Sequence, residues 1–221
     1  MHRLYHYPLS PFSRKVRLVL AEKKVEVELA EERYWEKTPE FLRRNPAGQV
    51  PLLKIGNRLM PDSGAICEYL EETHPTPPLL PATPEGRYEA RRLVAWFDDK
   101  FYHEVTSKLV GERVFRKVQG TGYPDSANLK AGTKAIKFHL GYMTWLLESR
   151  RWLAGNEMTI ADFAAAAHLS CIDYISDVNW NAADSVKDWY AKIKSRPAFR
   201  SILADQVPGF PQPSHYADLD F

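Results

Sequence analysis

The chain has 221 residues, of which 44% are hydrophobic and 26% are charged, a composition typical of a soluble globular protein. A chain of this length buries enough surface to fold without disulfide or metal cross-links, and it has room for one large domain or two small ones. Thirty basic and 28 acidic side chains leave a formal charge of +2, which gives no reason to expect nucleic acid or an anionic membrane as a partner. Only two cysteines occur, and we find no metal-ligand spacing, signal peptide or membrane-spanning run. We therefore expect a cytoplasmic, reduced protein without a bound metal and without membrane insertion.

The first 75 residues alternate between strand and helix patterns. The alternation of Val and Glu in Val25–Leu29 is typical of a half-buried strand, and Gly56-Asn57 separates two apolar runs as a hairpin turn does. Thr38 followed by Pro39 is a typical start of a helix. Together these patterns predict an α/β layer with a mixed four-stranded sheet. We expect strands over Arg3–His6, Val25–Leu29, Pro51–Ile55 and Arg58–Met60, and helices over Pro11–Glu22, Pro39–Arg44 and from Asp62 to about His74.

A cluster of prolines follows and predicts a stiff, extended linker over residues 76–84. Beyond it we find only helical patterns and no strand signal, so residues 85–204 are expected to form an all-helical domain. Residues 1–75 are then the N-terminal domain and residues 205–221 a C-terminal tail. The expected helices of the second domain are Glu85–Val118, Leu129–Glu148, Ile160–Ile175, Ser185–Ser195 and a short one ending near Leu203.

Ser10 lies where the first strand turns into the first helix. The unpaired amides and positive dipole at a helix start stabilise a thiolate or an oxyanion there. A serine hydroxyl cannot perform thiol–disulfide chemistry, but it can donate a hydrogen bond to a bound thiolate and so lower the pKa of that thiol. The alternative is that Ser10 only caps the helix.

Two further segments carry candidate binding groups. In Gln49-Val50-Pro51, the valine before proline is extended, and an exposed strand edge there could pair with the main chain of a peptide ligand. In Asp62-Ser63, free amides and a hydroxyl suit a carboxylate, while the aspartate suits an ammonium group. An amino-acid head group carries both charges. The alternative for Asp62-Ser63 is again a simple helix cap.

In this order the three segments resemble the thioredoxin-like half of the glutathione transferase superfamily. The resemblance covers nearly the whole chain and includes Asn156–Asp162, which resembles the family's helix capping box, with Thr159 and Asp162 satisfying each other's donors. It implies the glutathione transferase fold, an N-terminal thioredoxin-like βαβαββα domain followed by an all-helical C-terminal domain. It also implies a two-fold homodimer.

The resemblance further implies a catalytic role for one residue and a glutathione-binding role for six. Ser10 matches the serine that activates the thiolate. Val50 matches the residue whose backbone meets the glutathione cysteine, and Pro51 matches the cis-proline. Asp62-Ser63 matches the pair that holds the γ-glutamyl head. Lys37 matches a lysine that, in some classes, binds the glycine carboxylate of glutathione. Gln49 departs from the family pattern, because many members have a second lysine at this position.

Three features are not needed for a transferase. Tyr34-Trp35 stands in a polar stretch and could line a substrate pocket, anchor a protein partner, or pack across the linker or at a dimer interface. Residues 100–137 hold eight Lys and Arg against three acids, whereas the tail holds three Asp and no Lys or Arg, so this sorting of charge is either a solvated surface or a dock for an acidic partner. The ending Ser214–Phe221, a short acidic peptide with Tyr216, Leu219 and Phe221, is either a displayed recognition element or a segment folded back over the helical domain.

The tail, Tyr34-Trp35 and the Ser-Pro-Phe-Ser start are similar to those of a bacterial glutathione-transferase-like protein that binds the tubulin homologue FtsZ in cell division. Two functions follow. In the first, which the resemblance favours, the chain is a dimer recruited to the division site, where it binds FtsZ filaments and keeps a weak or vestigial glutathione site. In the second, it is a glutathione transferase acting on small electrophiles, with Tyr102 and His103 lining the second-substrate pocket. For the first function, we expect the contacts with FtsZ to come from Tyr34, Trp35, Arg113, Arg116, Asp218, Leu219 and Phe221.

Overall fold

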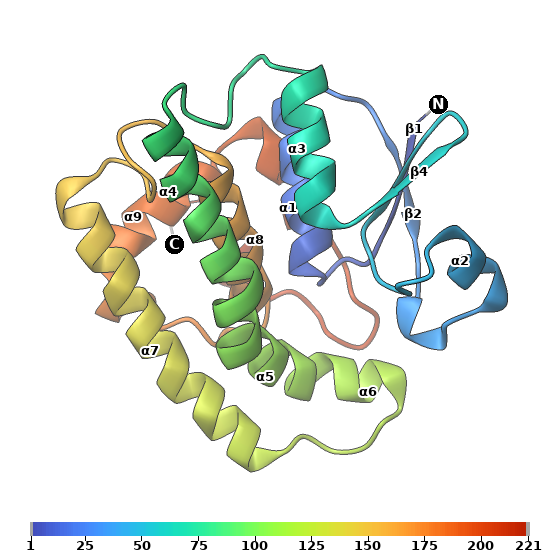
Figure 1. Ribbon diagram of the computed structural model, residues 1–221. Helices are drawn as coiled ribbons and strands as arrows, with labels where there is room; N and C mark the ends of the chain where they lie inside the picture. Colours follow the sequence, from blue (N-terminus) through green and yellow to red (C-terminus); the bar gives the residue numbers. More distant parts are fainter. Residues whose placement is uncertain (1, 220–221) are drawn as a thin grey trace.

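The computed structural model describes residues 2–219 and contains one mixed four-stranded sheet beside a helical domain, as predicted (Figure 1). The strand order is β2-β1-β3-β4, in which β1 runs parallel to β2 and antiparallel to β3, and β3 and β4 form a hairpin. Leu4 on β1 pairs with Leu29 on one side and Leu53 on the other. The strands are β1 (His2–His6), β2 (Glu28–Glu31), β3 (Leu52–Ile55) and β4 (Arg58–Pro61).

Helices α1 (Pro11–Glu22) and α3 (Ser63–Thr73) lie between the sheet and the helical domain, whereas α2 (Pro39–Arg44) lies apart from them (Figure 1). The apolar side of α1, with Val16, Val19 and Leu20, is buried. Each of these helices starts as the sequence predicts, because a Ser, Thr or Asp side chain accepts a hydrogen bond from a first-turn amide. A short 3-10 turn, η1 (Tyr34–Glu36), precedes α2.

The helical domain is built around α8 (Ile160–Tyr174), every residue of which is buried. The predicted capping box is present, since Thr159 and Asp162 each accept from the other's backbone. A long helical arm runs from Pro84 to Gln119, and two of its segments have the wider π-helical geometry. The arm comprises α4 (Pro84–Ala95), η2 (Trp96–Thr106), α5 (Ser107–Val110), η3 (Gly111–Phe115) and α6 (Arg116–Gln119). The remaining elements of this domain are α7 (Ser126–Ser149), η4 (Trp180–Ala182), α9 (Asp184–Lys194), η5 (Pro197–Phe199), α10 (Arg200–Leu203) and η6 (Ser214–Tyr216).

The second strand begins later than its sequence pattern predicts, at Glu28 instead of Val25. The amide of Val25 donates to the carbonyl of Leu20 at 2.9 Å, and Lys24 adopts a left-handed conformation with φ 56°. The end of α1 therefore uses this segment to close its last turn, and the chain becomes free to pair with β1 only from Glu28 onward.

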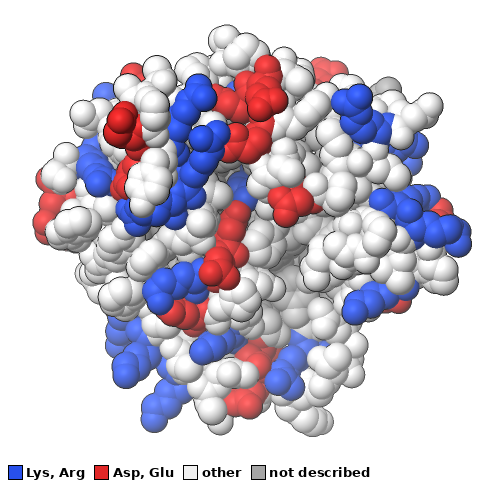
Figure 2. All heavy atoms as spheres, viewed as in Figure 1, with Lys and Arg blue, Asp and Glu red and all other residues white. Residues whose placement is uncertain are grey.

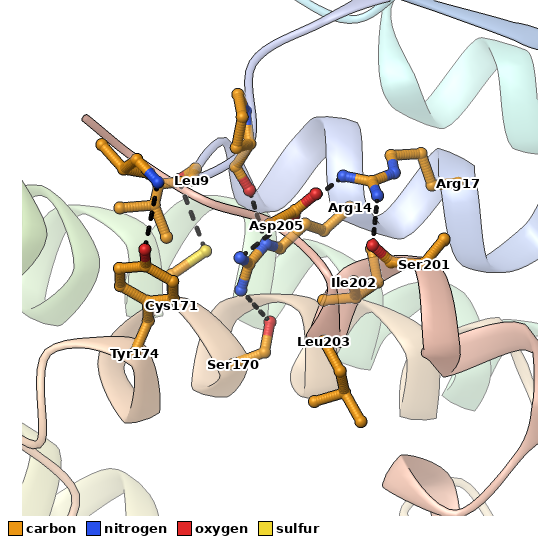
Figure 3. Close-up of polar contacts among 12 residues, drawn as sticks. Leu9, Arg14, Arg17, Ser170, Cys171, Tyr174, Ser201, Ile202, Leu203 and Asp205 are labelled. Atoms are coloured by element: carbon orange, nitrogen blue, oxygen red, sulfur yellow. Dashed lines mark hydrogen bonds and ion pairs between the residues drawn. The ribbon is translucent and has the colours of Figure 1, made fainter. Parts of the chain in front are cut away.

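The tail folds back over the helical domain as far as Tyr216, whose side chain is fully buried. Figure 3 shows the start of this segment between α1 and α8. The hydroxyl of Tyr174 accepts from the amide of Val207 at 3.1 Å and donates to the carbonyl of Phe210 at 2.7 Å. Of the two alternatives for the tail, folding back therefore holds through Tyr216, whereas Leu219 beyond it is 42% exposed. Phe221 lies outside the described residues.

Within residues 2–219, no helix is both long enough and apolar enough to cross a membrane.

Candidate functional site

Ser10 is the N-cap of α1 and has an extended backbone with φ −78° and ψ 114°. Its Oγ accepts a hydrogen bond from the amide of Ser13 at 3.2 Å. The hydroxyl proton of Ser10 has no acceptor among residues 2–219, so the side chain caps the helix and still has a hydrogen bond to donate. The two interpretations of Ser10 are therefore compatible, because one oxygen can accept from the helix and donate to a ligand.

Asn45, which we did not select from the sequence, holds the loop that carries Val50. Its side-chain amide donates to the carbonyl of Gln49 at 2.7 Å, and its Oδ1 accepts from the amide of Ala47 at 3.2 Å. Gly48 is left-handed with φ +62°, and a Cβ there would lie 3.1 Å from Leu42 Cδ2. The Asn-Pro pair and the glycine are a recognisable turn signal that could have identified this loop.

Val50 presents a free main chain beside Ser10. The Val50–Pro51 peptide bond is cis. Within the described part of the chain, neither the N–H nor the C=O of Val50 makes a hydrogen bond. An extended ligand can therefore pair with this residue as an added strand would.

Asp62 caps α3 with a backbone in the left-handed half of conformational space, at φ +74°. Its Oδ1 accepts from the amide of Ala65 at 2.8 Å, and a Cβ on Gly64 would lie 3.2 Å from the same oxygen. Such a conformation costs an aspartate on the order of 1 kcal/mol and directs its carboxylate at the helix start. Ser63 beside it is 8% exposed.

These three segments line one cleft between the two domains, and Figure 2 shows that this face of the molecule is hollowed there. The larger part, of about 450 Å³, is lined by Pro51, Asp62 and Ser63 together with residues of η2. The smaller part, of about 140 Å³, is lined by Ser10 and aromatic side chains. The two parts share the wall residues Phe12, Gln49, Val50 and Tyr102.

Six of the seven residues that we assigned to glutathione thus line this cleft, and Lys37 does not. Lys37 is exposed, ends η1 in a left-handed conformation with φ 46°, and lines neither part of the cleft. Within residues 2–219, no Lys or Arg lines either part of the cleft. The side of the cleft that would receive a carboxylate therefore relies on amides and hydroxyls.

Asp98 of η2 is a wall residue that the sequence analysis missed. Its carboxylate forms an ion pair with the fully buried Lys15 and lies 3.5 Å from Nε2 of His168. Burial by itself raises the pKa of Asp98, but Lys15 and His168 outweigh it and hold that pKa below its ordinary value. Asp98 thus keeps its charge beside Asp62. No sequence signal marks it, because one Asp on a helix is usually solvated.

Tyr34 and Trp35 have separate positions. Tyr34 lines the smaller part of the cleft, whereas Trp35 packs edge-on against Tyr7, with ring centroids 4.8 Å apart, and lies 6.2 Å from the ring of Phe115. Both side chains are half-buried. The aromatic cluster of Tyr7, Tyr34, Trp35 and Phe115 therefore connects the cleft with the surface around η3.

The residues assigned to a protein partner are less closely grouped. Arg113 is paired with Asp177 at 2.5 Å and Arg116 with Glu112, so both charges are already balanced within the chain. Further Lys and Arg side chains gather over the lower part of α7 in Figure 2. In the tail, Asp218 and Leu219 are exposed. The described residues contain no group of three or more His, Cys, Asp or Glu that could hold a metal ion.

Comparisons with known proteins match both halves of the chain. The family model for the glutathione S-transferase N-terminal domain matches residues 4–78, and that for the C-terminal domain matches residues 118–206. FtsZ-localized protein A of Caulobacter vibrioides is 49% identical over 222 residues, which cover 99% of this chain and 97% of that protein. Glutathione S-transferase 3 of Zea mays is 32% identical and covers 97% of this chain and 98% of its own length. The crystal structure of a glutathione S-transferase from Rhodospirillum rubrum, 49% identical, superposes with a TM-score of 0.98 over the whole of both chains.

Proposed function

This chain belongs to the glutathione S-transferase family, and we propose that it is a dimeric member that binds FtsZ filaments at the division site and regulates bacterial cell division. The observation that carries the proposal is the 49% identity, over 99% of this chain, to a protein named FtsZ-localized protein A. Similarity of this extent includes the surface as well as the core. A dimer would present two binding surfaces to one filament, so that weak contacts add in avidity.

Two surfaces are available for the filament. One is centred on Trp35, a large half-buried aromatic of the kind that dominates binding energy at interfaces. The other is the exposed, acidic end of the tail at Asp218 and Leu219. Because the tail is packed through Tyr216, this end projects from a fixed point and loses less entropy on binding than a free peptide would.

Co-sedimentation with polymerised FtsZ tests the proposal. We expect the full chain to pellet with filaments, and we expect Trp35→Ala and a chain that ends at Ala217 to pellet at least tenfold more weakly, as loss of an interface hot spot predicts. Tyr123→Ala, at an exposed aromatic outside the cluster, is the control and should bind normally. A full chain that stays in the supernatant contradicts FtsZ binding, and unchanged pelleting of both variants contradicts the assigned surfaces.

A second function, glutathione transfer, is supported by the free hydroxyl proton of Ser10 beside the free main chain of Val50. Glutathione would place its cysteine against Val50 and its γ-glutamyl head at Asp62 and Ser63, and Ser10 would hydrogen-bond the thiolate that attacks a small electrophile. Among the residues that the structure describes, no lysine or arginine lines the cleft to bind the glycine carboxylate, which is consistent with a weak site.

Calorimetric titration with glutathione, together with the ultraviolet absorbance of the bound thiolate, tests this second function. Ser10→Ala should raise the pKa of the bound thiol and lower the thiolate signal, whereas Ser13→Ala should not. Binding that is absent in the parent chain contradicts a glutathione site. Binding with a thiolate signal that is unaffected by Ser10→Ala contradicts the role of Ser10.

A further inference from the structure

A second cavity, of about 270 Å³, lies on the face of the sheet that is turned away from α1 and α3. Leu4 and Leu53 point toward those helices and are fully buried in the core. Because neighbouring residues of a strand point to opposite faces, Arg3 on β1 and Lys54 on β3 point to the other side, where this cavity lies. Within residues 2–219, it shares no lining residue with the cleft beside Ser10. The cavity is lined by Arg3, Tyr5, Arg44, Lys54, Asn57 and Leu59.

Three cationic side chains from three different elements meet at this cavity, and no acidic side chain of the described chain lines it. Arg3 comes from β1, Lys54 from β3 and Arg44 from the last turn of α2. Arg3 and Lys54 occupy directly opposed positions of an antiparallel strand pair. Like charges in such positions destabilise a sheet, so the chain keeps an unfavourable arrangement that a bound anion would relieve.

The three cations keep hydrogen-bond donors for a ligand. Arg3 donates to Glu28 through Nε and Nη2, at 3.1 and 2.8 Å, and its Nη1 makes no hydrogen bond within residues 2–219. Arg44 donates to Glu40 through Nη2, which leaves Nε and Nη1. The ammonium group of Lys54 makes no hydrogen bond or ion pair with any residue that the structure describes. A ligand can therefore bind all three cations without breaking an existing contact.

We propose that this cavity binds the phosphoryl group of a small anion through Lys54, Arg44 and Arg3, independently of FtsZ binding and of glutathione transfer. Guanidinium groups bind phosphate oxygens in pairs, and an ammonium group adds a point charge. A phosphoryl group has three acceptor oxygens and nearly two negative charges near neutral pH, which suits three cations better than the single charge of a carboxylate. Sites for drug-sized ligands measure about 300–1,000 Å³, so a cavity of about 270 Å³ selects a small compound, such as a phosphomonoester or a diphosphate.

Binding of inorganic diphosphate to the full chain tests the proposal. Calorimetric titration should show one site per chain, and the midpoint of thermal unfolding should rise with the diphosphate concentration. Lys54→Gln should weaken binding about 10- to 100-fold, the loss expected for one charge-assisted hydrogen bond, whereas Lys54→Arg keeps the charge and should retain most of the affinity. Arg58→Gln removes an exposed charge from the same hairpin but outside the cavity, so it is the matched control and should bind normally.

Thermal unfolding without diphosphate separates a binding role of Lys54 from a structural one. Lys54→Gln removes the like-charge pair with Arg3, so its midpoint should equal or exceed that of the parent. A midpoint well below the parent's would assign Lys54 to the stability of the sheet and contradict the proposal. Because sulfate stabilises proteins in general, sodium sulfate at equal ionic strength is the control for a salt effect.

The remaining outcomes are distinct. If diphosphate does not bind, if Lys54→Gln binds it as the parent does, or if sulfate raises the midpoint equally, the proposal is wrong. Vesicles of phosphatidylglycerol identify the source of the phosphoryl group. Co-flotation that Lys54→Gln abolishes supports the site with a lipid headgroup as its ligand, whereas diphosphate binding without co-flotation supports a soluble phosphorylated compound.

Discussion

Arg14 on α1 and Asp205 at the start of the tail form an ion pair, with 3.2 Å between Nη2 and Oδ2, although 191 positions separate them in the sequence. Arg14 is fully buried, and its other donors reach the carbonyl of Pro8 at 2.6 Å and Oγ of Ser170 at 2.8 Å (Figure 3). The same Asp205 oxygen accepts from Arg17 at 2.9 Å. One guanidinium group thus joins the strand–helix turn that carries Ser10 to α8 and to the tail.

We expect Asp205→Asn to destabilise the protein strongly. It leaves two buried guanidinium groups without a counter-ion, and breaking one partner of a buried ion pair costs about 3–5 kcal/mol. Urea unfolding followed by circular dichroism measures the free energy of unfolding. Asp188→Asn, on the exposed side of α9, is the matched control and should change that free energy by less than about 0.5 kcal/mol. Equal losses in the two variants would contradict the prediction.

Ser10 and Ser13 offer a matched pair for the helix start. Ser10→Ala removes the cap of α1 and should lower the free energy of unfolding by about 1 kcal/mol. Ser13 Oγ is buried and has no hydrogen-bond partner in the described part of the chain, so Ser13→Ala removes an unsatisfied group and should be neutral or stabilising. Urea unfolding of the two variants measures the difference. A larger loss for Ser13→Ala than for Ser10→Ala would show that the cap does not work as described.

The effect of truncating the tail on stability should depend on whether Tyr216 is retained. A chain that ends at Ala217 keeps the fully buried Tyr216 and the His215–Asp173 contact and should unfold at nearly the same urea concentration as the parent. A chain that ends at Pro213 loses Tyr216, which is fully buried, and also His215, whose Nε2 lies 3.1 Å from Asp173. Loss of a buried aromatic costs about 3–5 kcal/mol. If both truncations unfold alike, the packed position of Tyr216 is not important for stability.

His6 should make the protein sensitive to acid. It is 6% exposed, and burial, with Arg17 and Arg14 nearby, lowers its pKa to about 3 from the ordinary value of 6.5. Below about pH 6.5 the unfolded chain binds a proton at His6, whereas the folded chain binds it only near pH 3. Stability therefore falls as the pH drops through this window, by on the order of 5 kcal/mol in total. Above pH 7 the effect vanishes.

Urea unfolding at several pH values between about 7.5 and 4 measures this dependence. His6→Gln removes the titrating group and should flatten the slope. The buried His168 and His139, whose pKa values burial also lowers, contribute a remaining slope of the same sign. An identical slope in the parent and in His6→Gln would assign the acid sensitivity to those other groups.

Local chemistry explains why most elements were predictable. Pro and a capping side chain at the start of α1 and α2, the Gly56-Asn57 turn and the 159–162 capping box act within a few residues, and all of them are present. The start of β2 was predicted too early, because the amide of Val25 closes the end of α1 by donating to the carbonyl of Leu20 and is not available to pair with a neighbouring strand. That competition depends on three-dimensional closure and leaves no periodic signal.

The sequence identified several residues of the candidate site but not all of the residues that line the cleft. Ser10, Val50 and Asp62 are marked by their positions at element ends, where main-chain groups are unpaired. Asp98 comes from the other domain and was not selected from the sequence, and only the packing of η2 against the sheet domain brings it to the cleft. The distance of Lys37 from the cleft likewise depends on the turn that ends η1.

The sequence by itself determined the succession of strands and helices, the two-part organisation and the chemical character of each candidate group, because these follow from interactions between near neighbours. The tertiary structure alone decided which of those groups share a cleft, which cations already have a partner, and how far the tail is packed. Those outcomes depend on burial and on contacts such as that between Arg14 and Asp205, whose free energy exists only after distant segments have been brought together.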